Sequence, residues 1–401
     1  MALRRGHRTR PPLAVVFAVT VSGILSNTLI AAPLPDIVDD LGVPDSSAGL
    51  LVAAGSLPGI VMAPVVGLLA DRFGRRQVLV PCLVLFGVAG LAGALAPTFA
   101  TLVAARAVQG IGSAGLINLA VVLLADSWEG NERAKVIGWN AAVLTTSIAV
   151  FPTLGGLLAD AGGWRWAFAP YGFALVTAAA VWLVVPDRPR TASLGLRRQL
   201  ADAADVVRQP VVAGSIAFGC ALFVLIFGLF FTAMPLVLED GFGLEAGARG
   251  LLLSVPAVGS TLVALNLGRL RSRFGARRLL LVASTLFVVA FVAVGAAPTL
   301  AVLGVGVVVY GLGEGMAIPT VQDLVAGASP AASRGAVVAV WVGAARLGQT
   351  VGPLLTGVLL GVLDPQSVFF VGAGLAAALL GAQLVIRIRA PLPAASPPGP
   401  S

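Results

Sequence analysis

The chain has 401 residues, of which 58% are hydrophobic and 11% are charged, and its formal net charge is +8. An average soluble domain is ~45–50% apolar and ~25% charged, so this composition lacks the polar surface of a water-soluble globule. One histidine and two cysteines exclude a His/Cys metal cluster, a His-based catalytic triad and a disulfide framework. We therefore expect a polytopic all-α membrane protein without a metal or a cofactor.

Twelve apolar runs approach or exceed the ~20 residues that span a bilayer core. In the first half of the chain they cover about residues 12–35, 46–70, 77–96, 99–125, 135–159 and 165–185. In the second half they cover about residues 210–238, 246–268, 277–296, 299–326, 335–361 and 366–386. The runs do not alternate and are too long for the ~9–11-residue strands of a membrane barrel. The sequence therefore predicts twelve transmembrane helices.

The positions of Lys and Arg predict the orientation of these helices. Of the 26 cationic residues, 22 fall in the two tails and in every second loop, whereas the opposite loops hold only Arg165 and Arg249. Arg106 and Arg346 fall within spans. By the positive-inside rule both termini are cytoplasmic. Because the cations lie between apolar runs rather than along one face, they do not indicate nucleic-acid binding.

An internal repeat divides the chain into two halves. GLLADRFGRRQVL begins at Gly67 and GRLRSRFGARRLL begins at Gly268, an offset of 201 residues. The same offset pairs Gly49 with Gly250, Gly110 with Gly311, and Pro152 with Pro353. An even number of helices per half predicts a parallel repeat of two six-helix bundles. We expect bundles over 1–185 and 210–390, a cytoplasmic linker over 186–209 and a disordered tail over 391–401.

Three motifs resemble those of a known family. Gly67-x-Leu69-Ala70-Asp71-Arg72-x-Gly74-Arg75-Arg76 follows the second span, and LVAARAVQGIG runs from Leu102 to Gly112 around Arg106. The fifth span carries Pro152, Gly155 and Gly156, with Phe151 at the position of a further glycine, and the eleventh carries Gly348, Gly352 and Pro353. Together they resemble the motifs of the major facilitator superfamily, and specifically those of its bacterial drug:proton antiporters.

The resemblance implies that the loop motif forms a cytoplasmic gate. Its residues are Gly67, Asp71, Arg72, Gly74, Arg75 and Arg76. Gly67 would let two helix backbones approach closely, and Asp71 can accept hydrogen bonds from the free N–H groups at a helix start. A turn with positive-inside arginines would explain the cations alone, but it would not require an acid at position 71.

Charged residues within the spans are candidates for proton coupling. Arg106 lies ~10 Å inside the fourth span at 1.5 Å per residue, where a charge is costly unless it snorkels or faces water or a partner. Asp36 is the acid at the nearest depth. Glu314 and Arg346 lie near the middle of spans 10 and 11, so we expect them to interact. Glu314 is the first candidate for the proton carrier and Asp36 the second; the alternative is a purely structural Glu314–Arg346 pair.

Aromatic and amide side chains are candidates for a substrate cavity. Phe223, Phe227, Phe230 and Phe231 follow helical spacing on the seventh span, where they would form either one wall of an apolar cavity or a surface facing lipid. The other cavity candidates are Asn27, Asn140, Tyr310 and Trp341.

The expected function is secondary transport. No Walker sequence is present, so the chain would not hydrolyse ATP. We expect a monomer in the plasma membrane that exports small amphipathic organic compounds in exchange for protons as its two halves rock. A metabolite uniporter or proton symporter of the same fold is the alternative. A non-transporting sensor would carry a signalling domain, for which both tails are short, and a membrane enzyme would need a catalytic cluster.

Overall fold

The computed structural model describes residues 10–186, 207–327 and 334–385, and its regular secondary structure is helical. The first run of helices is α1 (Leu13–Thr28), α2 (Leu34–Asp40), η1 (Asp45–Ser47), α3 (Ala48–Phe73), α4 (Arg75–Ala94), α5 (Phe99–Ser113), α6 (Leu116–Ser127), α7 (Gly130–Gly162), η2 (Trp164–Gly172) and α8 (Phe173–Val184). The second run is α10 (Pro210–Val224), η3 (Leu225–Ala233), α11 (Met234–Asp240), α12 (Ala246–Ser254), α13 (Pro256–Gly295), α14 (Leu300–Gly327), α15 (Arg334–Leu360) and α16 (Pro365–Val385).

The helices follow the predicted spans to within a few residues, and the differences have local causes. Nine segments of the described chain are long and apolar enough to cross a membrane. One of them, Ala246–Gly295, contains two predicted spans, which are separated by a kink at Gly275 (φ 75°, ψ 160°), the repeat counterpart of Gly74 between α3 and α4. The predicted first span is divided between α1 and α2. The count of twelve stays a prediction.

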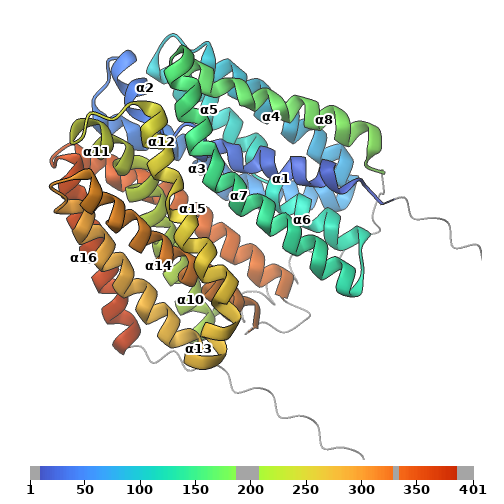
Figure 1. Cartoon of the computed structure of the whole chain (residues 1–401). Coiled ribbons are helices and arrows are strands. Elements are labelled where there is room, and N and C mark those ends of the chain that lie inside the picture. The colour runs from blue at the N-terminus through green and yellow to red at the C-terminus, as the bar shows by residue number, and fades with distance from the viewer. Residues whose placement is uncertain (1–9, 187–206, 328–333, 386–401) are drawn as a thin grey trace, which may run out of the picture.

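Each run of helices builds its own hydrophobic core. One cluster of buried side chains comes almost entirely from α1 to α8, and the other almost entirely from α10 to α16. Figure 1 shows the two groups side by side. They meet at the end that carries α2, α11 and α12, and they diverge toward α6 and α8 on one side and α13 on the other. The predicted linker and tail lie mainly outside the described residues.

The 201-residue repeat is visible in the contact between the two bundles. Gly49 of α3 packs against the backbone of Pro353 in α15, and Gly250 of α12 packs against the backbone of Pro152 in α7. Adding 201 to Gly49 gives Gly250, and adding 201 to Pro152 gives Pro353. The two contacts are therefore equivalent under the repeat. Glycine is needed at both positions, because an added Cβ would collide with a carbonyl oxygen.

The same repeat governs packing inside each bundle. Gly110 of α5 lies against the carbonyl of Gly55 in α3, and Gly311 of α14 lies against the carbonyl of Pro256 at the start of α13. Both members of each contact differ by 201 residues from their counterparts. The two bundles are therefore built by equivalent close approaches of helices.

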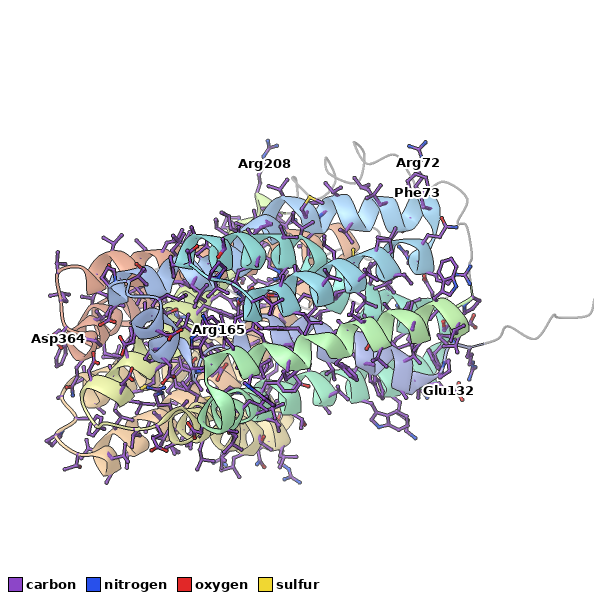
Figure 2. The ribbon with its side chains drawn as sticks, turned by 90° about the horizontal axis from the view of Figure 1, so that it is seen from above. Arg72, Phe73, Glu132, Arg165, Arg208 and Asp364 are labelled. Atoms are coloured by element: carbon purple, nitrogen blue, oxygen red, sulfur yellow. The ribbon has the colours of Figure 1, made fainter. Side chains whose placement is uncertain are left out.

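The close contacts between bundles belong to one end of the molecule, which we call the outer end. Toward the other end, the inner end, a Cβ added at Gly67, Gly138, Gly268 or Gly343 would meet nothing within 4 Å. Figure 2 shows Arg72, Phe73 and Glu132 at one end of the molecule and Asp364 at the opposite end. Residues of the predicted cytoplasmic loops therefore separate from those of the opposite loops.

Candidate functional site

Arg106 lies at the centre of a buried polar network in the first bundle. Its side chain is 1% exposed. Nη2 donates to Oδ1 of Asn27 at 2.5 Å, and Nη1 donates to Oε1 of Gln109 at 2.5 Å and to the hydroxyl of Tyr171 at 3.4 Å. Tyr171 donates in turn to the carbonyl of Ser26 at 3.0 Å. Neutral oxygen atoms thus hold this buried cation.

This network bears on Asp36, which was named as the acid at the nearest depth, and on Asn27, which was predicted to line a cavity. Asp36 is not the partner of Arg106, because the acid lies on α2, beyond the end of α1. Asn27 is occupied on both sides, since its Nδ2 donates to Ser56 Oγ at 2.8 Å while its Oδ1 accepts from Arg106. The sequence feature that indicates this contact with Arg106 is a polar residue, Asn27, within an otherwise apolar helix. Tyr171 had no signal in the sequence.

Asp36 instead pairs with Arg249 across the two bundles. Arg249 of α12 is 1% exposed, and its Nη2 donates to Oδ2 of Asp36 on α2. Its Nη1 also pairs with Oε1 of Glu239 in α11 at 3.0 Å. We call these three residues the outer latch. The prediction placed Arg249 in a loop, and the structure buries it, because two carboxylates compensate the loss of its hydration.

Further polar contacts join the bundles beside the outer latch. Oδ2 of Asp160, near the end of α7, accepts a hydrogen bond from the backbone N–H of Gly247 at 2.9 Å, where α12 begins. A carboxylate at this position also interacts favourably with the helix dipole. Thr153 and Ser254 share a hydrogen bond of 2.8 Å between their hydroxyls. Both ends of α12, at Gly247 and at Ser254, are thus held by side chains of the other bundle.

A second outer ion pair stays within the first bundle. Oδ2 of Asp40 accepts from Trp164 Nε1 at 2.8 Å and from Arg165 Nη1 at 2.7 Å. The hydrogen bond from Trp164 and then that from Arg165 hold the pKa of Asp40 below its usual value. Asp40 therefore stays ionised across the physiological pH range, and Arg165 serves as a matched reference for Arg249.

The predicted ion pair between Glu314 and Arg346 is wrong for this conformation. Among the ion pairs of the described chain none joins these residues. Ser260 of α13 is the side chain that interacts with Glu314, and the Ser260 hydroxyl donates to the carbonyl of Gly311 at 3.0 Å. Arg346 lies against α3 of the first bundle, where a Cβ added at Gly59 would be 3.6 Å from its Nε. The two residues have similar depths, but their side chains leave α14 and α15 in different directions.

The loop motif forms contacts inside the first bundle. Arg75 Nη1 pairs with Oδ1 of Asp71 at 2.7 Å, and its Nε lies 3.5 Å from Oδ2 of Asp126 at the end of α6. Arg76 donates to the carbonyl of Trp182 at 3.4 Å, and its guanidinium lies 4.9 Å from that indole. Gly74, with φ 99°, ends α3. The motif thus links α3, α4, α6 and α8 at the inner end. Arg72 projects from that end (Figure 2).

The motif residues of the fifth and eleventh spans all lie at close helix contacts. Gly155 packs against the carbonyl of Leu29, directly after α1, and Gly156 packs against Ala246 of the other bundle. Gly348 and Gly352 lie against the backbones of α10 and η3. Together with the Pro152 and Pro353 contacts described above, these approaches place α7 and α15 both within their own bundles and at the boundary between bundles.

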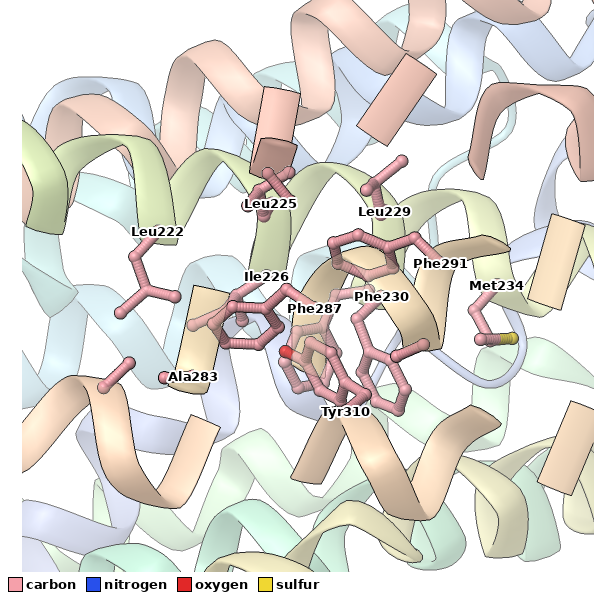
Figure 3. Close-up of a cluster of buried hydrophobic side chains, with 14 of the residues drawn as sticks. Leu222, Leu225, Ile226, Leu229, Phe230, Met234, Ala283, Phe287, Phe291 and Tyr310 are labelled. Atoms are coloured by element: carbon pink, nitrogen blue, oxygen red, sulfur yellow. The ribbon is translucent and has the colours of Figure 1, made fainter. Parts of the chain in front are cut away.

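Most of the predicted cavity residues are packed into helix contacts. Phe230 stacks on Tyr310 at 4.6 Å between ring centroids, and Phe287 and Phe291 surround the same tyrosine (Figure 3). Tyr310 is 2% exposed. Phe230 and Phe231 are likewise buried, so these rings belong to the core of the second bundle and face neither lipid nor a cavity.

Phe223 and Phe227 form the partly accessible margin of that core, beside the buried Trp341. Phe223 and Phe227 are partly buried, and the Phe223 ring lies 6.2 Å from both Phe227 and Trp341. Asn140 is buried in the first bundle, where its Oδ1 accepts from Thr20 Oγ1 at 2.7 Å between α7 and α1. Asn140 therefore joins helices, and Phe223 and Phe227 are the members of the predicted set with side chains left partly open.

An apolar cavity of about 330 Å³ lies elsewhere, between the inner parts of α3 and α4. Its walls include Phe73, Cys82 and Ile111. Across the described ranges no group of three or more His, Cys, Asp or Glu residues is placed to hold a metal ion.

Comparisons with known proteins agree with this architecture. The sequence pattern of the Major Facilitator Superfamily matches residues 15–249 and 216–401. The bacillibactin exporter of Bacillus subtilis is 25% identical over 319 residues, which are 75% of this chain and 78% of the exporter. The puromycin resistance protein pur8 of Streptomyces alboniger is 36% identical over 155 residues, which are 38% of this chain and 31% of that protein.

A solved structure shows the same fold. The crystal structure of the nucleoside transporter NupG superimposes with a TM-score of 0.73 at 15% identity, and the match covers 92% of this chain and 98% of NupG. At this identity the likeness concerns the arrangement of helices alone.

Proposed function

Because the chain belongs to the major facilitator superfamily, and is thus a membrane transporter and not an enzyme, we propose that it exports small amphipathic organic compounds by proton antiport. The observation that carries the proposal is the contact between bundles at one end only. Equivalent close approaches at Gly49 and Gly250 close the outer end, whereas Gly67 and Gly268 stand open at the inner end. This arrangement is one of the two states that alternating access requires.

The proposal places the inner end in the cytoplasm of a plasma-membrane protein, with both termini on the same side. The excess of cations in the loops at that end supports this orientation. The partners would be the bilayer, a small-molecule substrate and protons, with a monomer as the transporting unit. The open inner end would admit compounds from the cytoplasm, as export requires.

Glu314 is the proposed proton carrier. It is the acid near the middle of α14, and none of the ion pairs in the described chain includes it. A carboxylate at this depth is stabilised by a proton or by a partner. A proton that crosses the membrane potential contributes ~2.3 kcal/mol per 100 mV, which shifts a two-state equilibrium by more than tenfold.

Proteoliposomes with an imposed pH gradient and a panel of dyes and antibiotics test this function. We expect uphill movement of at least one compound that collapses with the pH gradient. Glu314→Gln should abolish uphill movement and retain passive exchange, because the variant cannot release a proton. Asp323→Asn, on the same helix at its inner end, is the control. Uphill transport by Glu314→Gln with unchanged pH dependence would assign the proton to another acid, and movement of a substrate without a gradient would favour a uniporter.

A further inference from the structure

We propose that Arg346 forms an oxyanion-binding site between the two bundles, so that the transported compounds carry a carboxylate or a similar anionic group. The inference rests on the proposed export function and names its substrate class. Its first support is position: Arg346 lies 12 residues from the start and 14 from the end of α15. At 1.5 Å per residue this is near the middle of the helix.

Arg346 reaches from its own bundle to the other. Its side chain runs along α3, with Cδ and Nε each 3.6 Å and Cζ 3.7 Å from the Cβ position of Gly59. The absence of a side chain at Gly59 leaves space for the guanidinium beside α3. A group bound to Arg346 would therefore lie at the boundary between the bundles, where a transported compound has to pass.

The guanidinium of Arg346 is without a counter-ion in the described part of the chain. It takes part in none of the ion pairs or side-chain hydrogen bonds found there, and its backbone carbonyl alone accepts a bond, from Thr350 Oγ1. The side chain is half-buried. A cation at mid-membrane depth is costly unless a partner or water compensates it, so an anionic ligand would bind with favourable electrostatics.

A second cation strengthens the positive potential at this place. The guanidinium of Arg106 lies against Gly55, one helical turn or about 6 Å along α3 from Gly59. Because Asn27, Gln109 and Tyr171 are neutral, they leave the charge of Arg106 uncompensated. Glu314 interacts with Ser260, and none of the ion pairs in the described ranges joins it to Arg346. Because Arg106 is enclosed, it adds only to the positive electrostatic potential of the site. Arg346 would make the direct contact with the anionic ligand.

The chemistry of arginine specifies the ligand. The planar guanidinium presents two parallel N–H groups that match the two oxygens of a carboxylate, and such charge-assisted pairs are stronger than neutral hydrogen bonds. A cationic compound would be repelled by both arginines. The apolar part of the ligand would lie against the partly open side chains of the second bundle, such as Phe223.

Binding and transport of three matched probes test the inference: pyrenebutyrate, its neutral amide and pyrenebutylamine. We expect the purified protein to bind pyrenebutyrate at least tenfold more tightly than the amide. Arg346→Gln should remove this preference and Arg346→Lys should keep part of it. Gly59→Leu fills the space beside the guanidinium from another helix and should weaken carboxylate binding without removing a charge. Arg273→Gln, at an exposed inner position, is the control.

The outcomes separate the inference from the proposed function. Equal binding of the acid and the amide, or a preference that survives Arg346→Gln, would overturn the anion site. If a neutral or cationic dye is then still exported along a pH gradient, the export function stands without the anion site. If no probe is transported but the carboxylate preference depends on Arg346, the binding site stands and proton-driven export fails.

Discussion

Arg249 shows what a single residue contributes that the sequence does not reveal. The sequence places it in a loop beside a glycine of the repeat. In the structure it is buried and pairs with Asp36, 213 residues away. Such a pair depends on how two bundles meet, and no local pattern encodes this. The acid at position 36 was identified, but its partner was not.

Breaking the outer latch should open the outer end. Removing one partner of a buried ion pair costs about 3–5 kcal/mol, an upper figure here because Asp36 is 38% exposed. Arg249→Gln leaves Asp36 and Glu239 without their shared cation, and the closed outer end loses stability relative to the open one. We expect a cysteine introduced at the buried Ala31 to react at least tenfold faster with an impermeant maleimide than in the parent protein.

Arg165→Gln is the matched control for the latch. It removes the same charge from the same end, but its ion pair with Asp40 is exposed and lies within one bundle. The labelling rate at position 31 should stay unchanged. Equal labelling rates in the Arg165 and Arg249 variants would show that the outer latch does not hold the outer end closed.

Glu314 and Arg346 show that a similar depth in the membrane does not by itself predict that two side chains interact. Counting residues along two spans places them at a similar height, but it does not fix the direction in which each side chain leaves its helix. Arg346 points to Gly59 of α3, and Glu314 points to Ser260 of α13. Direction depends on the rotation of each helix in the bundle, which a nearly uniform apolar surface does not specify.

At the scale of elements, the sequence predicts position well and continuity less well. The apolar runs locate the helices because a bilayer imposes their length. The repeat offset also predicts which glycines act alike, since Gly49 and Gly250 make equivalent contacts. The division of the first span into α1 and α2 was not predicted. It depends on local backbone geometry rather than on hydropathy.

The two outer glycines should be required for closure of the outer end. A methyl group at Gly49 or Gly250 would collide with the backbone of Pro353 or Pro152, which cannot move without displacing a helix. We expect Gly250→Ala and Gly49→Ala to favour the state open at the outer end, with labelling of a cysteine at Ala31 raised about as much by either change. Because the two sites are equivalent under the repeat, the account predicts labelling increases of similar size for the two variants.

Gly67→Ala and Gly268→Ala are the controls at the inner end. Both positions are open in this conformation, so the added methyl groups should not disturb closure of the outer end. Outer labelling that rises in these variants as well would point to general destabilisation of the fold. Normal labelling in Gly250→Ala would show that the α7–α12 contact is not needed for closure.

At the scale of the whole molecule, two bundles of equivalent construction meet at one end. The repeat predicted two similar halves, but it could not predict which end is closed, because one sequence has to satisfy more than one arrangement of the bundles. The outer latch, the Asp160 contact and the glycine pairs stabilise closure at the outer end. The inner loop motif meanwhile forms its ion pairs within the first bundle.

The central claim is that the two ends open in alternation, and distances between spin labels at both ends test it most directly. One pair of labels replaces the exposed Trp139 and Phe274 toward the inner end, and the other replaces Leu95 and Val362 at the outer end, in a background without Cys82 and Cys220. Acidification or Arg249→Gln should shorten the inner distance and lengthen the outer distance in the same fraction of molecules. Two distances that stay fixed, or that lengthen together, would contradict the account.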